Sequence, residues 1–195
     1  MDTRDMLNMI WEKISHDPFF GNKSLGSGTG TYIVPYDPKD ELIVRDFLSN
    51  FREKGDGFEV QIFDLYDIMI ETLESNGYLD AAFDLEEDCR SEGNIDAFRS
   101  EMTNLLQPDS LNDVFVQYIQ QHAAPGNVIF LTGVGKCHPF IRVHKILNNY
   151  DGRANGVKIV AFYPGTYDYE KLVLFNTIES ESYYKALKLV EGDDL

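Results

Sequence analysis

The chain of 195 residues is 43% hydrophobic and has a formal net charge of −16 at pH 7. This length suits one domain over residues 1–195 and excludes two large ones, and the acidic charge disfavours direct binding to DNA, whose protein partners usually carry a basic surface. No apolar run is long enough to cross a bilayer and no basic segment leads into an apolar stretch, so we expect a cytoplasmic protein without a membrane span or signal peptide. Cys89 and Cys137 are too few for a disulfide framework and are expected to be reduced.

The amino-terminal third alternates between helical and strand patterns. Apolar residues at helical spacing predict an amphipathic helix over 3–15, and a β-rich segment predicts a strand over 31–36. A second helix is expected over 40–54 and a second strand over 58–63. Asp64 can cap a third helix that stops at Asn76-Gly77, so the predicted order is helix, strand, helix, strand, helix.

Residues 80–101 are strongly acidic. Two bases, Arg90 and Arg99, stand against eight acids: Asp80, Asp84, Glu86, Glu87, Asp88, Glu92, Asp96 and Glu101. The segment is either an exposed helical excursion that binds a basic partner or a solvated insertion. A helix capped by Asp109-Ser110 is expected to follow and to end at Pro125-Gly126.

The carboxyl-terminal third is the most regular part of the sequence. The apolar run 128–131 predicts a strand buried on both faces, and a helix is expected from Pro139 onward. A further strand is predicted over 157–163, a short one over 172–175, and a closing helix over 182–190. Alternating strands and helices indicate a three-layer α/β fold, an open, mainly parallel sheet flanked by helices (Rossmann-like), with an acidic helical excursion.

Ligands of such sheets bind beyond the carboxyl ends of the strands, where two turns hold suggestive residues. The segment Gly133-Val134-Gly135-Lys136 is no phosphate loop, because Phe130 and Cys137 replace a required glycine and a required Ser or Thr. The expected ligand or partner crevice comprises Gly133, Gly135, Lys136, His138, Arg142, Lys145, Pro164, Gly165, Tyr167, Asp168 and Asp37.

A basic stripe follows this turn, since no acid lies between Pro125 and Tyr150. It can hold an anion or an acidic partner, or pair with acids of the chain itself. Arg142 is expected one helical turn beyond the loop, paired with Asp37 or Asp168, and burial of that pair would make Arg142→Ala cost about 3–5 kcal/mol.

The sequence gives less support to a catalytic or metal-binding site than to a binding crevice. Cys137, His138 and His144 lack the spacing of a zinc site, and the sequence gives no sign that Cys137 is an activated nucleophile, so neither metal nor cofactor is predicted. Asp37, Asp64 and Asp168 at strand ends can bind a metal in a hydrolase, although capping and turn roles explain them more simply.

Several linked motifs give the chain a resemblance to a known family. They are Phe130-Leu131-Thr132-Gly133-Val134-Gly135, Pro139-Phe140-Ile141-Arg142 with Leu147-Asn148-Asn149, Phe162-Tyr163-Pro164-Gly165-Thr166-Tyr167, and Tyr183-Tyr184-Lys185-Ala186. In this order they resemble the BrxB family of bacteriophage exclusion (BREX) systems. Lys185 stands where the family has an arginine, and Cys137-His138 where an aromatic residue commonly precedes Pro139.

The resemblance implies a role in restricting phage infection, together with a methyltransferase, the ATPase BrxC and the phosphatase-like protein PglZ. It implies no assigned reaction for the chain itself. With the missing catalytic motifs and the acidic surface, this favours a non-catalytic adaptor that binds other BREX proteins. The alternative is a nucleotide- or metal-dependent enzyme, or a nucleotide sensor, using the crevice.

Overall fold

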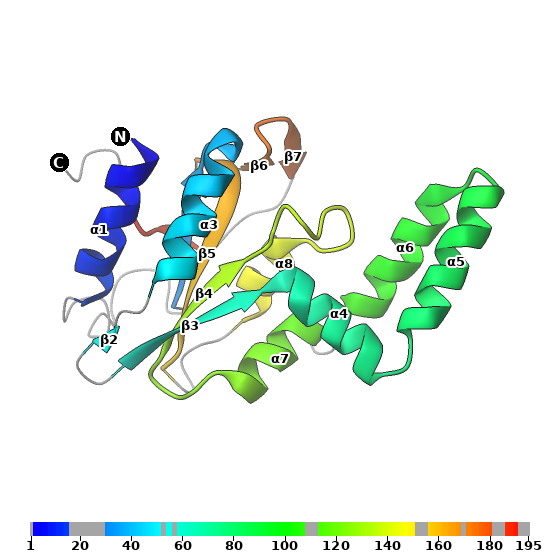
Figure 1. Ribbon diagram of the computed structural model, residues 1–195, viewed down its shortest axis with the longest axis horizontal. Coiled ribbons are helices and arrows are strands. Elements are labelled where there is room, and N and C mark those ends of the chain that lie inside the picture. The colour runs from blue at the N-terminus through cyan, green and yellow to red at the C-terminus, as the bar shows by residue number, and fades with distance from the viewer. Residues whose placement is uncertain are drawn as a thin grey trace.

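A mainly parallel β-sheet forms the centre of the molecule, as the computed structural model in Figure 1 shows. The structure describes residues 2–15, 30–51, 54–55, 58–107, 113–150, 156–168, 171–180 and 186–190. The strand order is β2-β3-β4-β5-β1-β8, and only β2 runs antiparallel on this path. These strands are β1 (Thr31–Tyr36), β2 (Lys54–Gly55), β3 (Phe58–Asp64), β4 (Val128–Thr132), β5 (Lys158–Tyr167) and β8 (Leu187–Lys188).

Helices cover both faces of the sheet. One face is covered by α1 (Thr3–Ser15) and α3 (Glu41–Asn50), the latter preceded by the short helix η1 (Pro38–Asp40). The other face is covered by α4 (Leu65–Ser75), α7 (Val114–His122) and α8 (Val143–Asn149). The three-layer α/β fold expected from the sequence is thereby confirmed.

The alternation of side chains along β4 explains why its first four residues are all apolar. Val128 and Phe130 belong to the core beneath α1 and α3, whereas Ile129 and Leu131 belong to the core beneath α7 and α8. Successive side chains of a strand point to opposite faces, so a strand with helices on both sides must be apolar at every position. All five residues of β4 are buried.

The acidic segment forms a helical hairpin, α5 (Leu79–Ser91) and α6 (Ile95–Leu106), which we call the arm. Figure 1 shows it extending from α4 at the end of the molecule away from α1. Its inner side is anchored by Phe98, whose ring meets that of Phe140 edge-on with centroids 5.4 Å apart. Thr103 Oγ1 also donates a hydrogen bond to the Phe140 carbonyl oxygen at 3.3 Å.

Three sequence predictions differ from the structure. Residues 134–140 form turns, so α8 begins at Val143 and not at Pro139, and Arg142 is its N-cap. Strand β5 continues through Pro164-Gly165, where it pairs with β6 (Leu172–Leu174), which in turn pairs with β7 (Ile178–Ser180). The expected closing helix is wrong over its described part, because β8 pairs with β1 there.

Two expectations fall partly or wholly outside the described residues. The cap predicted at Asp109-Ser110 lies outside them, and the observed N-cap of α7 is Asp113. Residues 182–185 of the expected closing helix also lie outside them. Among the described residues, no helix has the length and apolar character needed to cross a membrane.

Candidate functional site

Only some of the expected crevice residues lie together at one edge of the sheet. The parallel strands β1, β3, β4 and β5 bring their carboxyl ends to the same edge. Gly133 and Gly135 follow β4 there, and Gly165 lies on the outgoing part of β5. A Cβ atom at Gly135 would come within 3.3 Å of Pro164 Cγ, so the turn after β4 lies against β5.

Lys136 and Asp64 join the ends of β4 and β3. The Lys136 ammonium donates to the Asp64 carboxylate, which also accepts a hydrogen bond of 2.9 Å from the Tyr66 backbone N–H at the start of α4. The ammonium additionally lies 6.0 Å from the centre of the Tyr66 ring. Lys136 is therefore engaged within the chain, and Asp64 has the capping role that its position suggested.

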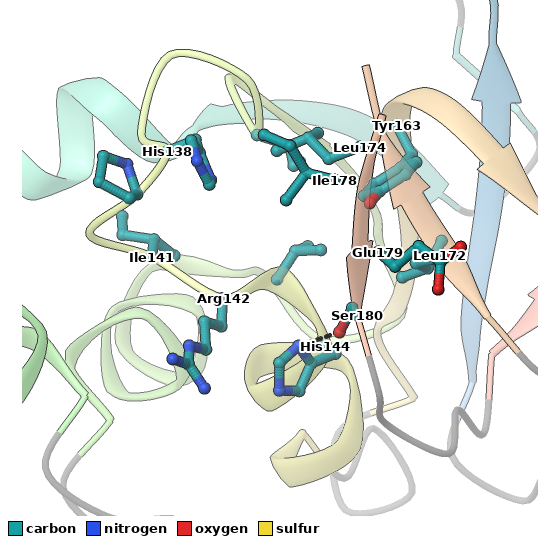
Figure 2. A pocket seen from close by; sticks show the side chains of 13 residues that line it. His138, Ile141, Arg142, His144, Tyr163, Leu172, Leu174, Ile178, Glu179 and Ser180 are labelled. Carbon is teal, nitrogen blue, oxygen red and sulfur yellow. Dashed lines mark hydrogen bonds between the residues drawn. The ribbon is translucent and has the colours of Figure 1, made fainter. Parts of the chain in front are cut away.

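A cavity of about 550 Å³ opens beside these turns. Figure 2 shows His138 on one side of it, Arg142 and His144 on another, and Tyr163, Leu174 and Ile178 opposite. Its lining combines apolar side chains with the polar or charged groups of His138, Arg142, His144, Glu179 and Ser180. The lining residues are Val134, His138, Pro139, Ile141, Arg142, Val143, His144, Tyr163, Leu172, Leu174, Ile178, Glu179 and Ser180.

The polar side chains of the cavity differ in charge. Burial, followed by the nearby charges of Arg142 and Lys145, lowers the pKa of His144 to about 4. Burial, followed by the charge of Arg99, also lowers the pKa of His138 below its usual value. Both rings are therefore mainly neutral at pH 7, which leaves the exposed Arg142 as the cationic group among the lining residues.

The predicted ion pair of Arg142 with Asp37 or Asp168 is wrong. Asp37 caps η1 and pairs with Lys39 at 2.7 Å, and Asp168 accepts the Lys171 backbone N–H at 2.7 Å. Each aspartate carboxylate forms its contacts within its own turn and forms no ion pair with Arg142. Within the described parts of the chain, the Arg142 side chain forms no ion pair with a carboxylate.

Two other expected site residues have structural contacts elsewhere. Lys145 Nζ donates to the Gln107 backbone carbonyl at 3.2 Å, at the junction of the arm and α7. The Tyr167 hydroxyl donates to the Ala186 carbonyl at 2.8 Å, in the buried interior. Neither residue lines the cavity.

The geometry speaks against the catalytic readings of the cysteine and the acids. Burial, followed by the charge of Asp64, raises the pKa of Cys137 to about 12, opposite to what a nucleophilic thiol needs. Asp37, Asp64 and Asp168 serve separate caps and turns. In the parts of the chain that the structure describes, no group of three His, Cys, Asp or Glu side chains has the arrangement of a metal site.

Several cavity residues were missed by sequence reasoning. Tyr163 was predicted only as part of a strand. Ile178, Glu179 and Ser180 lie on β7, a strand that no apolar and polar alternation in the sequence predicts. In the sequence His144 was considered only as a metal ligand. Its Nδ1 lies 3.5 Å from Ser180 Oγ, a contact between residues 36 positions apart that the sequence gives no means of seeing.

The outer face of the arm is a second candidate site. The Phe83 side chain is 59% exposed and sits among the exposed acids Asp84, Glu87 and Asp88 on one side of α5. Residues 79–106 hold eight acids and two arginines, a formal charge of −6. The arm thus presents an aromatic ring inside an acidic surface.

Comparisons with known proteins agree on one family. A model of the family described as BREX protein BrxB matches residues 61–189. A BREX protein BrxB from Bacillus cereus (strain H3081.97) is 40% identical over 190 residues, which are 96% of this chain and 97% of the relative. Another from Escherichia coli O9:H4 (strain HS) is 25% identical over 189 residues, 94% of this chain and 90% of the relative. No solved structure matches the chain.

Proposed function

The chain belongs to the BrxB family of BREX proteins, and from this membership we propose that it is a non-catalytic adaptor that holds other BREX components together. As a BREX component it serves defence against phage. The single observation that carries the adaptor role is the arm, which presents an exposed aromatic side chain and a dense negative charge.

The arm has a firm base and a free outer face. Phe98, Met102 and Leu106 of α6 are buried in the core shared with α4 and α7, so the hairpin is fixed to the body of the protein. On the outer side, Phe83 is too exposed to contribute to that core. Large apolar side chains at such positions commonly serve as anchors in protein interfaces.

The chemistry of the arm specifies its partner. A protein surface with Lys and Arg around an apolar pocket would be attracted by the acids and would bury Phe83. Attraction between charged surfaces mainly speeds association, whereas burial of the ring supplies affinity. A DNA backbone is the wrong partner for this face because it would be repelled.

The test is capture of BREX proteins by the tagged chain. PglZ and BrxC are the proposed partners, and we expect at least one to co-purify with the wild-type protein at micromolar concentration. The arm variant Phe83→Ala/Glu87→Lys, which removes the exposed ring and reverses one charge, should no longer co-purify with that partner. Glu74→Lys, an exposed substitution on α4, is the matched control and should retain it. Absence of both partners from the wild-type sample would refute the adaptor role.

The alternative is a nucleotide- or metal-dependent enzyme, or a nucleotide sensor, that uses the strand-end crevice. Only the cavity favours it, because Lys136 is occupied by Asp64 and the Cys137 thiol is buried. A thermal-shift screen with nucleotides and divalent metals separates the two, since a ligand at 100 times its dissociation constant stabilises a protein by about 2.7 kcal/mol. A reproducible shift would favour the alternative.

A further inference from the structure

The outer edge of β3 is unpaired over most of its length. On that edge β2 pairs only with Phe58 and Glu59, whereas β4 pairs with the inner edge from Val60 to Asp64. Among the residues that the structure describes, none forms a hydrogen bond with the outer backbone edge of residues 60–64. A free strand edge is a template on which another strand can pair.

Alternation along the strand decides which backbone groups point outward. The Glu59 N–H donates to Asn127 Oδ1 at 3.2 Å, and Asn127 directly precedes β4, so Glu59 directs this group to the inner side. In a parallel pair, the N–H and C=O of successive residues point alternately to the two sides of the strand. The backbone groups of Val60, Ile62 and Asp64 therefore point to the open edge.

This edge lacks the features that usually prevent strand edges from pairing, which include Lys, Pro and bulges. Residues 60–64 contain neither Lys nor Pro and pair with β4 in unbroken register. Ile62 lies on the same face as Val60, beside α3, and is 39% exposed. Figure 1 shows α3 on one side of β3 and α4 and α7 on the other. An apolar side chain thus lies exposed next to open backbone groups.

A second copy of β3 fits this edge in a single register. When two copies lie antiparallel about a two-fold axis at Ile62, Ile62 lies opposite its own copy and Val60 lies opposite Asp64, so outward groups meet outward groups. A shift of two residues in one direction would bring Asp64 opposite Phe58, which β2 already pairs. The same shift in the other direction would bring Val60 opposite Tyr66, which belongs to α4.

Local charge is compatible with this pairing, although the chain has a net charge of −16. The one acid of the open segment, Asp64, lies opposite an apolar residue and accepts from the Lys136 ammonium of its own chain. No acid therefore faces an acid across the paired residues. The remaining repulsion between two acidic chains acts over longer distances, where dissolved salt screens it.

We infer that two copies of the chain pair through residues 60–64 of β3, antiparallel about a two-fold axis at Ile62, and form one continuous sheet. The arm follows β3 through α4, and Figure 1 shows it beyond the carboxyl end of β3. Antiparallel pairing would therefore carry the two arms to opposite ends of the dimer. Such a dimer is bivalent and can join two partner molecules, which goes beyond the proposed adaptor function without depending on it.

The first test measures the mass of the purified full chain by sedimentation equilibrium over a range of micromolar concentrations. We expect a dimer whose dissociation constant falls when NaCl is raised from about 0.05 M to about 0.5 M, because salt screens the repulsion between the two chains. Ile62→Lys places two ammonium groups opposite each other at the axis and should weaken the dimer about tenfold or more. Ile95→Lys, at a position on the arm that is also 39% exposed, is the matched control and should dimerise as wild type does.

The second test uses Ile62→Cys to check the register. Directly opposite residues of a hydrogen-bonded antiparallel pair have Cα atoms about 5.5 Å apart, which a disulfide can span. Mild oxidation should therefore link two copies of this variant covalently, as seen on a non-reducing gel. The native Cys89 and Cys137 are buried and should not contribute. Leu42→Cys is the control, because residue 42 is 76% exposed on α3 but lies outside the paired segment, and it should remain mainly monomeric.

Three results would overturn the inference. They are a monomer at every concentration and salt level, an unchanged dissociation constant in a folded Ile62→Lys, and equal cross-linking through residues 62 and 42. Folding of each variant is checked by circular dichroism melting, and the cross-linking result stands even if Ile62→Lys fails to fold. These measurements use the chain alone, whereas the adaptor function is tested by capture of PglZ and BrxC, so either proposal can fail while the other stands.

Discussion

The Asp64 carboxylate occupies the space where a side chain at residue 133 would begin. A Cβ atom on Gly133 would lie 2.2 Å from Asp64 Oδ1, and the φ angle of Gly133 is +77°. The same carboxylate caps α4 and accepts from Lys136. The glycine after β4 therefore lets the end of β3, the start of α4 and the turn before α8 meet at one point.

Gly133→Ala should be strongly destabilising for this reason. A left-handed alanine costs about 1–2 kcal/mol, and displacing the Asp64 cap costs about 0.5–2 kcal/mol more. We expect a loss of about 1.5–4 kcal/mol in the free energy of unfolding, measured by urea denaturation. Gly126→Ala is the control: its φ is +80° with no atom within 4 Å of the added Cβ, so it should lose only about 1–2 kcal/mol. Equal losses would show that the carboxylate moves aside freely.

The outer face of the arm should affect partner capture without affecting the fold. In Phe83→Ala/Glu87→Lys, two exposed side chains change, and surface substitutions usually alter stability by less than about 0.5 kcal/mol. Circular dichroism melting should therefore match wild type while co-purification is lost. A lower melting temperature together with lost capture would instead indicate that the arm had come away from the core.

The sequence was sufficient for the layers of the fold because they follow from local patterns. The run Val128–Leu131 is apolar at every position, as expected of a central strand, and the stripe on residues 3–15 fits one face of a helix. The turn after β4 was harder to predict. Phe140 and Val143 have helical spacing, but Phe140 is held by Phe98 and Thr103 of the arm, more than 30 residues earlier.

The candidate site was predictable only as a region. The end of β4 and the turn after it were expected to border a ligand or partner crevice. His138 and Arg142 line the cavity, and its use as a binding site stays a prediction. Its opposite wall comes from β7, a three-residue strand whose formation depends on pairing with β6 rather than on its own pattern. Lys145 was expected in the crevice together with Arg142, yet it donates to the Gln107 carbonyl and does not line the cavity.

His144 should make stability depend on pH below neutrality. Its pKa is lowered from 6.5 to about 4, chiefly by burial, so the native ring stays neutral where the unfolded chain binds a proton. Its contribution to stability is therefore fully present above pH 6.5 and is lost as the pH falls toward 4. We expect the free energy of unfolding to decline less between pH 7 and 5 in His144→Gln than in wild type, measured by urea titrations. The same pH dependence in both proteins would contradict this.

Cys137 should be unreactive in the native protein. Its thiol is fully buried and its pKa is raised to about 12, so little thiolate exists at pH 8. Cys89 is also buried. A thiol-reactive chromogenic disulfide should therefore label the native chain far more slowly than the chain in urea. Rapid labelling that disappears in Cys137→Ser would mean that the thiol is accessible and would revive its nucleophilic role.

Arg142→Ala should leave the stability of the protein almost unchanged. The side chain is exposed and has no carboxylate partner among the described residues, so truncation strands no buried charge, and the change should lie within about 0.5 kcal/mol. Asp113 provides the contrast. It is fully buried, caps α7 through the Phe115 and Val116 N–H groups, and accepts from Gln107 Nε2 at 3.0 Å.

Asp113→Ala leaves those donors without their acceptor and should cost about 2–4 kcal/mol, from the lost cap and the unsatisfied amide. Both variants are compared with wild type by urea denaturation, and Arg142→Ala is also assayed for phage defence. Native stability with defence lost would assign Arg142 a direct part in binding. A stability loss in Arg142→Ala close to that of Asp113→Ala would instead make Arg142 a structural residue.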